Sequence, residues 1–430
     1  MSNDQLAILG GTPVLDGQFP RYSTIGGAEK SAVMSVLDSG ELSGFIASPG
    51  KEFNGGPAVQ ALEAQFRERF GVKHAVAVNS ATSGLHCAAA ALDLGPGDEV
   101  IVPPYTMTAT STVVVMMGAV PVFADIEDRT FCLDPESVEA QISSQTKAIF
   151  AVNLFGHPAR LKELRAIAEK HDLFLLEDNA QSPAGLYQNR YTGTIGDVGV
   201  FSFNRHKTMQ CGEGGMIVTD DDRIARKAAY FRNHGEGVVE ALGETDIVNT
   251  LGLNYRMTEM EAAVAGVQFR RLDELNDARI KLANRLSKNL SEFEGITPPA
   301  VEEGCKHVYY FHVSKFDPEV AGTRRDTFVK ALTAEGFPVR AGYVKPVYRE
   351  PMFQQKIALG RGGFPWSSHP RDVSYDPKQF STVERLNASE VFLTHLIYPP
   401  LTENDMDLFG EAVGKVMANK DALRSLEDEN

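Results

Sequence analysis

Three groups of polar residues in this 430-residue chain follow short apolar runs, at points where buried strands would end. The first group is residues 79–84, NSATSG, which follow the run HAVAV at 74–78 and precede a stretch of small, helix-compatible residues. Backbone N–H groups and hydroxyls at the start of a helix attract anions, so this segment is a candidate phosphate site. An ordinary Ser or Thr helix cap would have the same residues, and the segment alone leaves both interpretations open.

The other two groups supply an acid and an amine. The apolar run 174–178, FLLED, ends in Asp178, whose carboxylate would lie at the carboxyl edge of a sheet, either facing a ligand or solvated in a loop. Lys207 lies between the strand-like runs 198–203 and 215–221. Partial burial and the neighbouring cation Arg205 would lower the pKa of this amine and make it nucleophilic toward an aldehyde. The alternative is a solvated lysine in a loop.

Pyridoxal 5'-phosphate (PLP) needs all three features together. The candidate phosphate site at 79–84 would hold the PLP phosphate, the Asp would keep the pyridine nitrogen protonated, and the Lys would form a Schiff base with the aldehyde. The patterns GxGxxG, GxxxxGK[ST], HExxH and GxSxG are absent from the sequence, so NAD-binding, P-loop, zincin and serine-hydrolase interpretations lack their usual support. The four cysteines are scattered without a CxxC pair, and we expect no metal site.

A sheet is needed to position these residues. Strand-like and helix-like runs alternate over the first two-thirds of the chain, which predicts an α/β fold with a mainly parallel central sheet flanked by helices. The expected strands are 74–78, 99–103, 121–126, 148–155, 174–178, 198–203 and 215–221, and the expected helices are 83–92, 107–117, 135–142 and 161–171.

The pattern changes after Thr258, where apolar residues keep helical spacing over residues 259–293. This spacing predicts one long or kinked helix that joins two domains. The large domain is expected at residues 1–285, with an N-terminal arm at about residues 1–25, and a smaller C-terminal α+β domain at 286–430. In the second domain we expect a strand at 307–316, helices at 325–335 and 403–417, and a surface excursion at 354–377.

Composition excludes several classes of protein. The chain is 43% hydrophobic and carries a formal net charge of −15 with no run of Lys or Arg, so neither a disordered chain nor a nucleic-acid scaffold is indicated. The longest apolar stretch, 112–124, contains Gly118 and Pro121 and is too short to span a bilayer. The N-terminus lacks the pattern of a secretory signal, and we expect a cytoplasmic protein without a nucleic-acid or membrane partner.

Ordered motifs along nearly the whole chain carry a family resemblance. They include NSATSGL at 79–85, GDEVIVPPYT at 97–106, LLEDNAQSPAG at 175–185, GDVGVFSFNRHKTMQCGEGGMIVTDD at 196–221 and GLNYRMTEMEAA at 252–263. The sequence resembles the DegT/DnrJ/StrS family of sugar aminotransferases. The resemblance implies the type I PLP-dependent transferase fold of aspartate aminotransferase.

The resemblance also implies roles for individual residues. Lys207 would be the Schiff-base lysine and proton shuttle, Asp178 would pair with the pyridine nitrogen, and Gln181 would lie near the phenolic oxygen. Phosphate binding would fall to Ser80, Ala81, Thr82 and Ser202. Met107 stands where the family has an aromatic residue stacked on the cofactor ring, and Tyr105, two residues earlier, is the alternative. His206 is expected to be a flanking residue, although a related dehydratase branch has His in place of the lysine.

Asn254 is implied to reach the phosphate of a neighbouring subunit, which requires a homodimer with shared active sites. The alternative is that Asn254 caps the helix that begins near Thr258. The implied reaction moves an amino group from glutamate or glutamine to a keto-sugar, expected to be nucleotide-linked, or to a keto-cyclitol, in a ping-pong cycle through pyridoxamine phosphate. A PLP-type sugar dehydratase and a non-catalytic regulator with the same fold are the alternatives.

Overall fold

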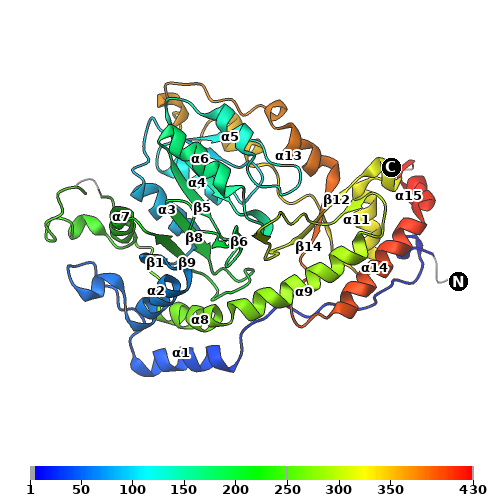
Figure 1. The fold of residues 1–430 in the computed structure, drawn as a ribbon, viewed down its shortest axis with the longest axis horizontal. Helices are drawn as coiled ribbons and strands as arrows, with labels where there is room; N and C mark the ends of the chain where they lie inside the picture. The colour runs from blue at the N-terminus through cyan, green and yellow to red at the C-terminus, as the bar shows by residue number, and fades with distance from the viewer. Residues whose placement is uncertain (1–4, 248–249, 429–430) are drawn as a thin grey trace.

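A seven-stranded sheet forms the centre of the molecule (Figure 1). The structure is a computed structural model that describes residues 5–247 and 250–428; residues 1–4 of the predicted arm and residues 429–430 of the predicted second domain lie outside the described residues. In spatial order the strands are β1 (His74–Val78), β9 (Gly215–Thr219), β8 (Val198–Ser202), β5 (Phe174–Asp178), β4 (Thr146–Val152), β2 (Glu99–Val102) and β3 (Val120–Phe123). Within this sheet β9 is antiparallel to both neighbours, and the remaining pairs are parallel.

Each strand expected from the sequence is present, with ends that differ by a few residues, and the predicted α/β fold is confirmed. The strands are fully buried or nearly so, because helices cover both faces. The helices of this part are α1 (Gly27–Ser39), α2 (Pro57–Phe70), α3 (Ala81–Ala91), α4 (Ala109–Met116), α5 (Pro135–Gln141), α6 (Leu161–His171), α7 (Asp222–Arg232) and α8 (Glu259–Arg270). Among the described residues, no helix combines the length and apolar character needed to cross a membrane.

Aromatic packing joins α2 and α8 to the β1–β9–β8 end of the sheet. Phe66 of α2 stacks on Phe269 of α8 with ring centroids 4.1 Å apart, and its edge meets Phe201 of β8 at 5.5 Å. These rings belong to a buried cluster that also contains residues of β1 and β9. The helices α3 and α7 pack together and against β1 and β9 as well. The start of α3, next to the end of β1, is therefore held firmly in place.

The long helical pattern after Thr258 is a kinked pair of helices. The helix α8 ends at Arg270, and α9 (Leu272–Leu290) continues it beyond a break at Arg271. Figure 1 shows α9 running away from the central sheet toward a second, four-stranded antiparallel sheet. This sheet has the order β10 (Ile296–Thr297), β12 (His312–Phe316), β14 (Val391–Thr394), β13 (Arg340–Ala341).

Four helices share a core with the second sheet: α10 (Pro318–Ala321), α11 (Arg325–Ala334), α14 (Glu403–Ala418) and α15 (Lys420–Asp428). The short helices α12 (Pro351–Gln355) and α13 (Ser381–Arg385) instead bury residues in the core of the central sheet. A separate small sheet has the order β11 (Cys305–Lys306), β6 (Leu186–Tyr187), β7 (Arg190–Tyr191). The predicted strand at 307–316 is shorter than expected, since only 312–316 pairs in the sheet. The domain boundary at residue 285 stays a prediction.

The N-terminal arm lies along the second sheet's helices and ends beside the central sheet. Near its start, the N–H groups of Ala7 and Val14 donate to the carboxylate of Glu335, which is fully buried and also pairs with Lys415. At its other end, the hydroxyl of Tyr22 donates to the carbonyl oxygen of Thr208 at 2.6 Å. The arm therefore connects the two sheets directly.

The segment 354–377 is only partly the surface excursion expected from its Gly, Ser and Pro content. Residues 354–363 are mostly exposed, but Trp366 and Tyr375 are buried, and Tyr375 packs against Phe123 at the end of β3. The indole N–H of Trp366 donates to the Tyr375 hydroxyl at 2.7 Å, and this hydroxyl donates to the carbonyl oxygen of Pro121 at 2.8 Å. The exposed residues 370–372 agree with the predicted surface segment, but the prediction missed that the buried side chains of Trp366 and Tyr375 anchor its second half.

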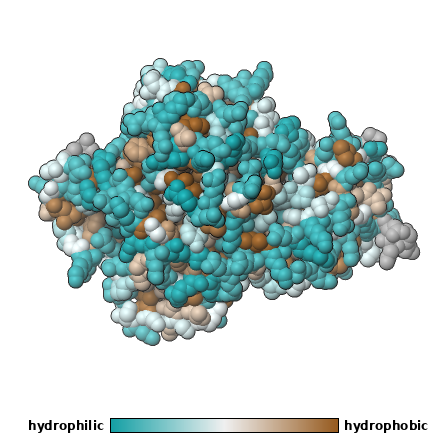
Figure 2. All heavy atoms as spheres, in the orientation of Figure 1, coloured by the Kyte–Doolittle hydropathy of each residue, from teal (hydrophilic) through white to brown (hydrophobic). Residues whose placement is uncertain are grey.

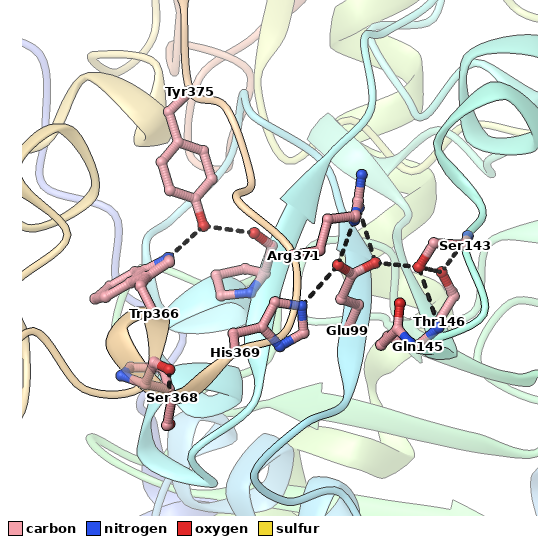
Figure 3. Close-up of polar contacts among 11 residues, drawn as sticks. Glu99, Ser143, Gln145, Thr146, Trp366, Ser368, His369, Arg371 and Tyr375 are labelled. Atoms are coloured by element: carbon pink, nitrogen blue, oxygen red, sulfur yellow. Dashed lines mark hydrogen bonds and ion pairs between the residues drawn. The ribbon is translucent and has the colours of Figure 1, made fainter.

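A buried carboxylate holds the same segment to the central sheet (Figure 3). Glu99, the first residue of β2, is fully buried and accepts two hydrogen bonds of 2.8 Å from Arg371. His369 contributes a ring nitrogen at 2.8 Å and Ser143 a hydroxyl at 2.6 Å. This cluster lies at the amino edge of β2, away from the strand ends expected to form the active site.

We predict that Glu99→Gln lowers the free energy of unfolding by about 1–3 kcal/mol, because Arg371 and His369 lose a charged acceptor in a buried position. Urea unfolding at pH 7 measures the difference. Arg129→Ala is the matched control, because its 68% exposed side chain pairs with Glu302 at 3.8 Å and such a pair contributes little. Equal losses in the two variants would contradict the prediction.

The same contribution should depend on pH. Burial raises the pKa of Glu99, but the hydrogen bonds from Arg371, Ser143 and His369 outweigh it and hold the pKa below the ordinary value of 4.5. A carboxyl with a lowered folded-state pKa stabilises the fold above its unfolded pKa and loses that effect as the pH falls. The stability difference between the wild type and Glu99→Gln should therefore shrink below pH 4.5.

Candidate active site

The predicted site residues come together at one edge of the central sheet. The strands β1, β5 and β8 run in the same direction, so Val78, Asp178 and Ser202, at which they end, lie at the same edge. The antiparallel β9 begins there with Gly215, paired with Ser202. The connection from β8 to β9 carries Lys207, which therefore also lies at this edge.

The candidate phosphate site is built around the start of α3. Ser80 is the N-cap of α3, and its hydroxyl oxygen accepts from the N–H of Ser83 at 3.0 Å. Among the described residues, no hydrogen bond occupies the N–H groups of Ala81 and Thr82, the first two residues of the helix. They are thus available to an anion. The cap and the anion site, which the sequence left as alternatives, coexist in this segment.

Gly215 allows β9 to approach this helix start closely. A Cβ atom on Gly215 would lie 2.8 Å from the N atom of Ala81, a distance that real Cβ atoms do not reach. The absence of a side chain therefore brings Ser202, the register partner of Gly215, to the same small space as the start of α3. Donors from two separate parts of the chain, at residues 80–82 and at 202, surround this space.

Asp178 is the acid of the site. Its side chain is buried and accepts from the hydroxyl of Thr110 at 2.8 Å and from the N–H of Ala180 at 3.1 Å. Burial raises the pKa of Asp178, and the two hydrogen bonds and the charge of Lys207 only partly oppose this effect. The carboxylate is therefore placed where a cationic partner would stabilise its ionised form.

The neighbouring Glu177 points to a different place. Its carboxylate accepts from the backbone N–H groups of Gly193, Ile195 and Gly196 at 2.7, 2.7 and 2.8 Å, and it is fully buried. Consecutive residues of a strand face opposite sides of the sheet, so only one of this acidic pair faces the site. Glu177 shapes the turn at 193–196.

Hydrogen bonds hold both the oxygen and the nitrogen of the Gln181 side-chain amide. Its Oε1 accepts from the N–H of Phe155 at 2.8 Å, and its Nε2 donates to the hydroxyl of Tyr343 at 3.3 Å. The side chain is buried near the end of β5. The amide is therefore oriented before any ligand arrives.

Lys207 places its amine over an aromatic ring. The Nζ atom lies 4.2 Å from the ring centroid of Tyr310, a cation–π contact. Tyr310 reaches this position because its N–H and that of Val308 donate to the carbonyl oxygens of Phe155 and Gly156. A side chain at Gly156, whose φ is +98°, would lie 2.7 Å from the N atom of Tyr309. The glycine thus permits the approach.

Burial lowers the pKa of Lys207 to about 8, while the negative charge of Asp178 raises it and limits the shift. From the sequence, burial and the positive charge of Arg205 were both expected to lower the pKa of Lys207. Arg205 is exposed, and the charge that acts on the amine is that of Asp178. His206 is exposed as well, as expected of a flanking residue. A pKa near 8 leaves a useful fraction of the amine unprotonated at neutral pH.

Two residues were candidates for covering a cofactor ring. Tyr105 is fully buried, donates from its hydroxyl to Asn387 Oδ1 at 3.1 Å and accepts from the N–H of Tyr343 at 2.8 Å. The side chain of Met107 is 60% exposed at the end of the β2–α4 connection. Of the two, Met107 is the side chain that remains accessible to a ligand.

Asn254 is exposed in an extended segment that borders the same site. The carbonyl oxygen of the next residue, Tyr255, accepts from the N–H of Asn79 at 3.0 Å. The helix α8 begins with Thr258 as its N-cap, in a reciprocal capping box with Glu261. The alternative that Asn254 caps this helix is therefore wrong. Its exposed side chain accepts at Oδ1 from the N–H of Arg256, a long contact of 3.4 Å.

The sequence did not predict that Thr110 and Tyr343 hydrogen-bond to the predicted cofactor-site residues Asp178 and Gln181. Thr110 belongs to a run of hydroxyl residues, 106–112, directly after β2, and that position at the carboxyl end of a strand was a usable signal. Tyr343 had no local signal, because it lies in a loop after β13 and meets Gln181 only through the packing of the second sheet. Groups of three or more His, Cys, Asp or Glu side chains able to hold a metal ion do not occur among the described residues.

The central sheet with its antiparallel β9, the lysine on the β8–β9 connection and the smaller antiparallel sheet define an aminotransferase of the type I PLP-dependent transferase fold. The model of the DegT/DnrJ/EryC1/StrS aminotransferase family matches residues 45–371, and the chain belongs to this family.

Comparisons with individual proteins agree. The chain is 36% identical to a putative L-glutamine:3-amino-2,3-dideoxy-scyllo-inosose aminotransferase of Streptoalloteichus tenebrarius, covering 98% of this chain and 99% of that protein. It is 32% identical to the spore coat polysaccharide biosynthesis protein SpsC of Bacillus subtilis, over 92% and 96% of the two chains. The crystal structure of an aminotransferase from Psychrobacter cryohalolentis superposes with a TM-score of 0.80 at 29% identity, over 93% and 99% of the chains.

We predict that Asp178→Asn lowers the pKa of Lys207 below 8, because the carboxylate charge that favours the ammonium form is removed. The pH dependence of Lys207 acetylation by acetic anhydride, followed by mass spectrometry in protein freed of small molecules, measures this pKa. The exposed Lys378 in the same sample reports the effect of pH on the reagent. An unchanged or higher midpoint in the variant would show that Asp178 does not act on the amine.

Proposed function

We propose that this aminotransferase binds PLP and moves an amino group from glutamine or glutamate to the ketone of a cyclitol or sugar. The observation that carries the proposal is the half-buried Lys207, whose lowered pKa and position beside Asp178 suit reaction with an aldehyde. When bound, PLP supplies that aldehyde and a ring that withdraws electrons from the substrate. A cytosolic location, expected from the sequence, is part of the proposal.

The residues at the sheet edge fit this group. The phosphate would accept from the N–H groups of Ala81 and Thr82 and from the hydroxyls of Ser80 and Ser202, at the positive end of α3. The space between β9 and α3 that Gly215 keeps open supports this assignment.

The cofactor ring would lie between residues that follow strands of the central sheet and residues that the second sheet positions. Asp178 would hold a proton on the pyridine nitrogen, and that cation would stabilise a carboxylate whose pKa burial now raises. Gln181, fixed by Phe155 and Tyr343, would donate toward the phenolic oxygen. The thioether of Met107 would cover one ring face.

Lys207 would transfer protons during the reaction. Its Nζ would hold the cofactor at rest and would serve as the group that takes a proton from, and returns it to, the substrate carbon. The ring of Tyr310 would support the amine whenever it holds that proton, since a cation over an aromatic face is stabilised. A dehydratase would be hindered by this lysine, which recaptures the cofactor, so retention of Lys207 favours transamination.

The substrates are proposed from the relatives. The cyclitol aminotransferase of S. tenebrarius is named for glutamine as donor and matches 98% of this chain, so glutamine and a keto-cyclitol are the first pair to test. Nucleotide-linked keto-sugars and glutamate form the second panel, because SpsC is named for polysaccharide biosynthesis. Transfer of ¹⁵N from labelled donor to a ketone acceptor, detected by mass spectrometry, would support the proposal. Failure of every donor and acceptor pair would refute it.

We predict that Lys207→Ala loses about 10²–10⁴-fold or more in turnover, because the proton carrier and attachment point are removed. Borohydride should fix PLP covalently to the wild type and not to the variant. His206→Ala is the matched control, since His206 is the adjacent exposed residue and should retain both properties. Equal loss in the two variants, or fixation of PLP to Lys207→Ala, would exclude this role for the lysine.

We further propose a homodimer whose subunits complete each other's sites through Asn254. Exposed apolar side chains support an interface: Met34 and Leu37 of α1, and Leu251 and Leu253 beside Asn254. The helix α1 forms the lower edge of the molecule in Figure 1, where Figure 2 shows apolar residues at the surface. Leu251 is 77% exposed, and large apolar side chains left open to solvent favour a protein–protein contact at their surface.

A mixing experiment tests the shared site. Lys207→Ala and Asn254→Ala subunits, each inactive or nearly so alone, should recover part of the activity after subunit exchange, because some heterodimers contain one site with both residues intact. Exchange is checked with differently tagged subunits, and mixed Lys207→Ala proteins carrying the two tags are the control. Proven exchange without recovery would place Asn254 in its own subunit's site.

A further inference from the structure

The backbone of Tyr309 lies in the left-handed region, with a φ of +50°. This region is unfavourable for residues that carry a Cβ atom, and a bulky aromatic residue is a rare occupant. Tyr309 is 3% exposed and lies in the connection from β11 to β12. Strain of this kind persists only where the surrounding contacts hold it, and it clusters at functional sites. A contact that holds this conformation is therefore expected close to Tyr309.

The imidazole of His307 supplies that contact. The N–H of Tyr309 donates to Nδ1 of His307, two residues earlier in the chain, at 3.0 Å. The two rings are also stacked, with centroids 3.8 Å apart and planes inclined by 11°. Nδ1 accepts this bond only when it carries no proton. Burial lowers the pKa of His307 well below 6.5, and the neighbouring His157 and His312 lower it further, so the neutral ring that the bond requires is the form present at neutral pH.

A second left-handed turn holds the residues on either side of Tyr309. Phe155 has a φ of +57° and Gly156 a φ of +98°. Their carbonyl oxygens accept from the N–H groups of Tyr310 at 2.6 Å and of Val308 at 2.9 Å. The acceptors for these two N–H groups are backbone atoms, which no substitution removes. The acceptor for the N–H between them is a side chain, so a substitution can release this part of the turn.

The turn carries the ring of Tyr310 to the reactive amine. The Nζ atom of Lys207 lies 4.2 Å from the centroid of that ring, and Tyr310 is itself buried. A ring in this position keeps water from the amine and offers its face to the ammonium form. Tyr310 directly follows Tyr309, so a rotation of the backbone at Tyr309 would move the ring away from Nζ.

We propose that His307 is a positioning residue for the reactive amine: its Nδ1 holds Tyr309 in the left-handed conformation, which keeps the ring of Tyr310 on Lys207. The value of this role for amino transfer rests on the proposed function, whereas its effect on the amine requires no cofactor. The alternative is that the ring of His307 only packs on Tyr309, and an apolar ring of similar size would then replace it.

The pKa of Lys207 in protein freed of small molecules tests the proposal. The midpoint of its acetylation by acetic anhydride against pH gives this pKa, with the exposed Lys378 as internal reference. His307→Phe keeps a ring to stack on Tyr309 but removes the acceptor. Its midpoint should rise by at least about one pH unit, because water reaches an amine whose pKa burial lowers from 10.5 to about 8. Loss of the cation–π contact acts in the opposite direction and is the smaller effect.

A rescue variant and a matched control accompany this measurement. His307→Asn should keep the wild-type midpoint, because its Oδ1 can accept from the same N–H and Asn favours turns of this kind. His312→Phe is the control. His312 is equally buried and stacks on Tyr309 at 6.4 Å, but its ring nitrogens lie beside serine hydroxyls. This variant should unfold at a lower urea concentration without a change in the Lys207 midpoint.

A double substitution tests the backbone step by itself. Glycine adopts a positive φ without strain, so a turn with Tyr309→Gly no longer depends on His307. His307→Phe should therefore shift the Lys207 midpoint in the wild type and leave it unchanged when added to Tyr309→Gly. An equal shift in the two backgrounds would overturn the proposal.

Tyr310→Ala tests the second step, since it removes the ring and leaves His307 and Tyr309 in place. Its Lys207 midpoint should rise as in His307→Phe. If His307→Phe does not fold, His307→Leu removes the same acceptor and is measured in its place. An unchanged midpoint in Tyr310→Ala or in the folded His307 variant would overturn the proposal. A rise in His307→Asn as large as in His307→Phe would also overturn it and assign the ring to packing.

The outcomes separate this proposal from the proposed function. A protein whose Lys207 midpoint responds to His307→Phe as expected, but whose wild type transfers no amino group, would retain the positioning role and refute the transaminase assignment. A wild type that transfers the amino group, with a midpoint that His307→Phe leaves unchanged, would retain the function and refute the positioning role.

Discussion

The site depends on one constraint. The amine of Lys207 is partly removed from water, and the buried carboxylate of Asp178 acts on it. Lys207 is neutral enough to react because burial disfavours its charge, and Asp178 prevents the shift from becoming larger. Neither residue could create this balance alone. Three strand ends, a cap at the start of α3 and a tyrosine from the second sheet together fix how far the two charged groups lie from each other and from solvent.

The sequence predicted the part of the site that local patterns encode. Ser80, Asp178 and Lys207 each follow a short apolar run, and because parallel strands end at one edge, their assembly followed from the strand assignment. The same reasoning could have identified Thr110, but it was not applied to that residue. Side chains alternate between the two faces of a strand, and this rule alone predicts that only one of Glu177 and Asp178 faces the site. In the structure Glu177 holds a turn and Asp178 faces the site.

The remainder of the site depends on packing between distant segments, which no local pattern encodes. Tyr310 meets Lys207 because its backbone hydrogen-bonds to Phe155, and Tyr343 meets Gln181 through the placement of β13. The anchoring of segment 354–377 was missed for the same reason. Its Gly and Pro content is typical of a loop, while two aromatic residues and the contact of Arg371 with Glu99 anchor it.

The N-terminal arm makes the backbone next to Lys207 depend on contacts that are distant in the sequence. Glu335, Tyr398 and Lys415 hold the arm, and the hydroxyl of Tyr22 in the same arm holds the carbonyl oxygen of Thr208. A substitution that releases the arm from the second sheet's helices would therefore also remove a restraint from the loop that carries the reactive amine, although no contact of the substituted residue reaches that loop.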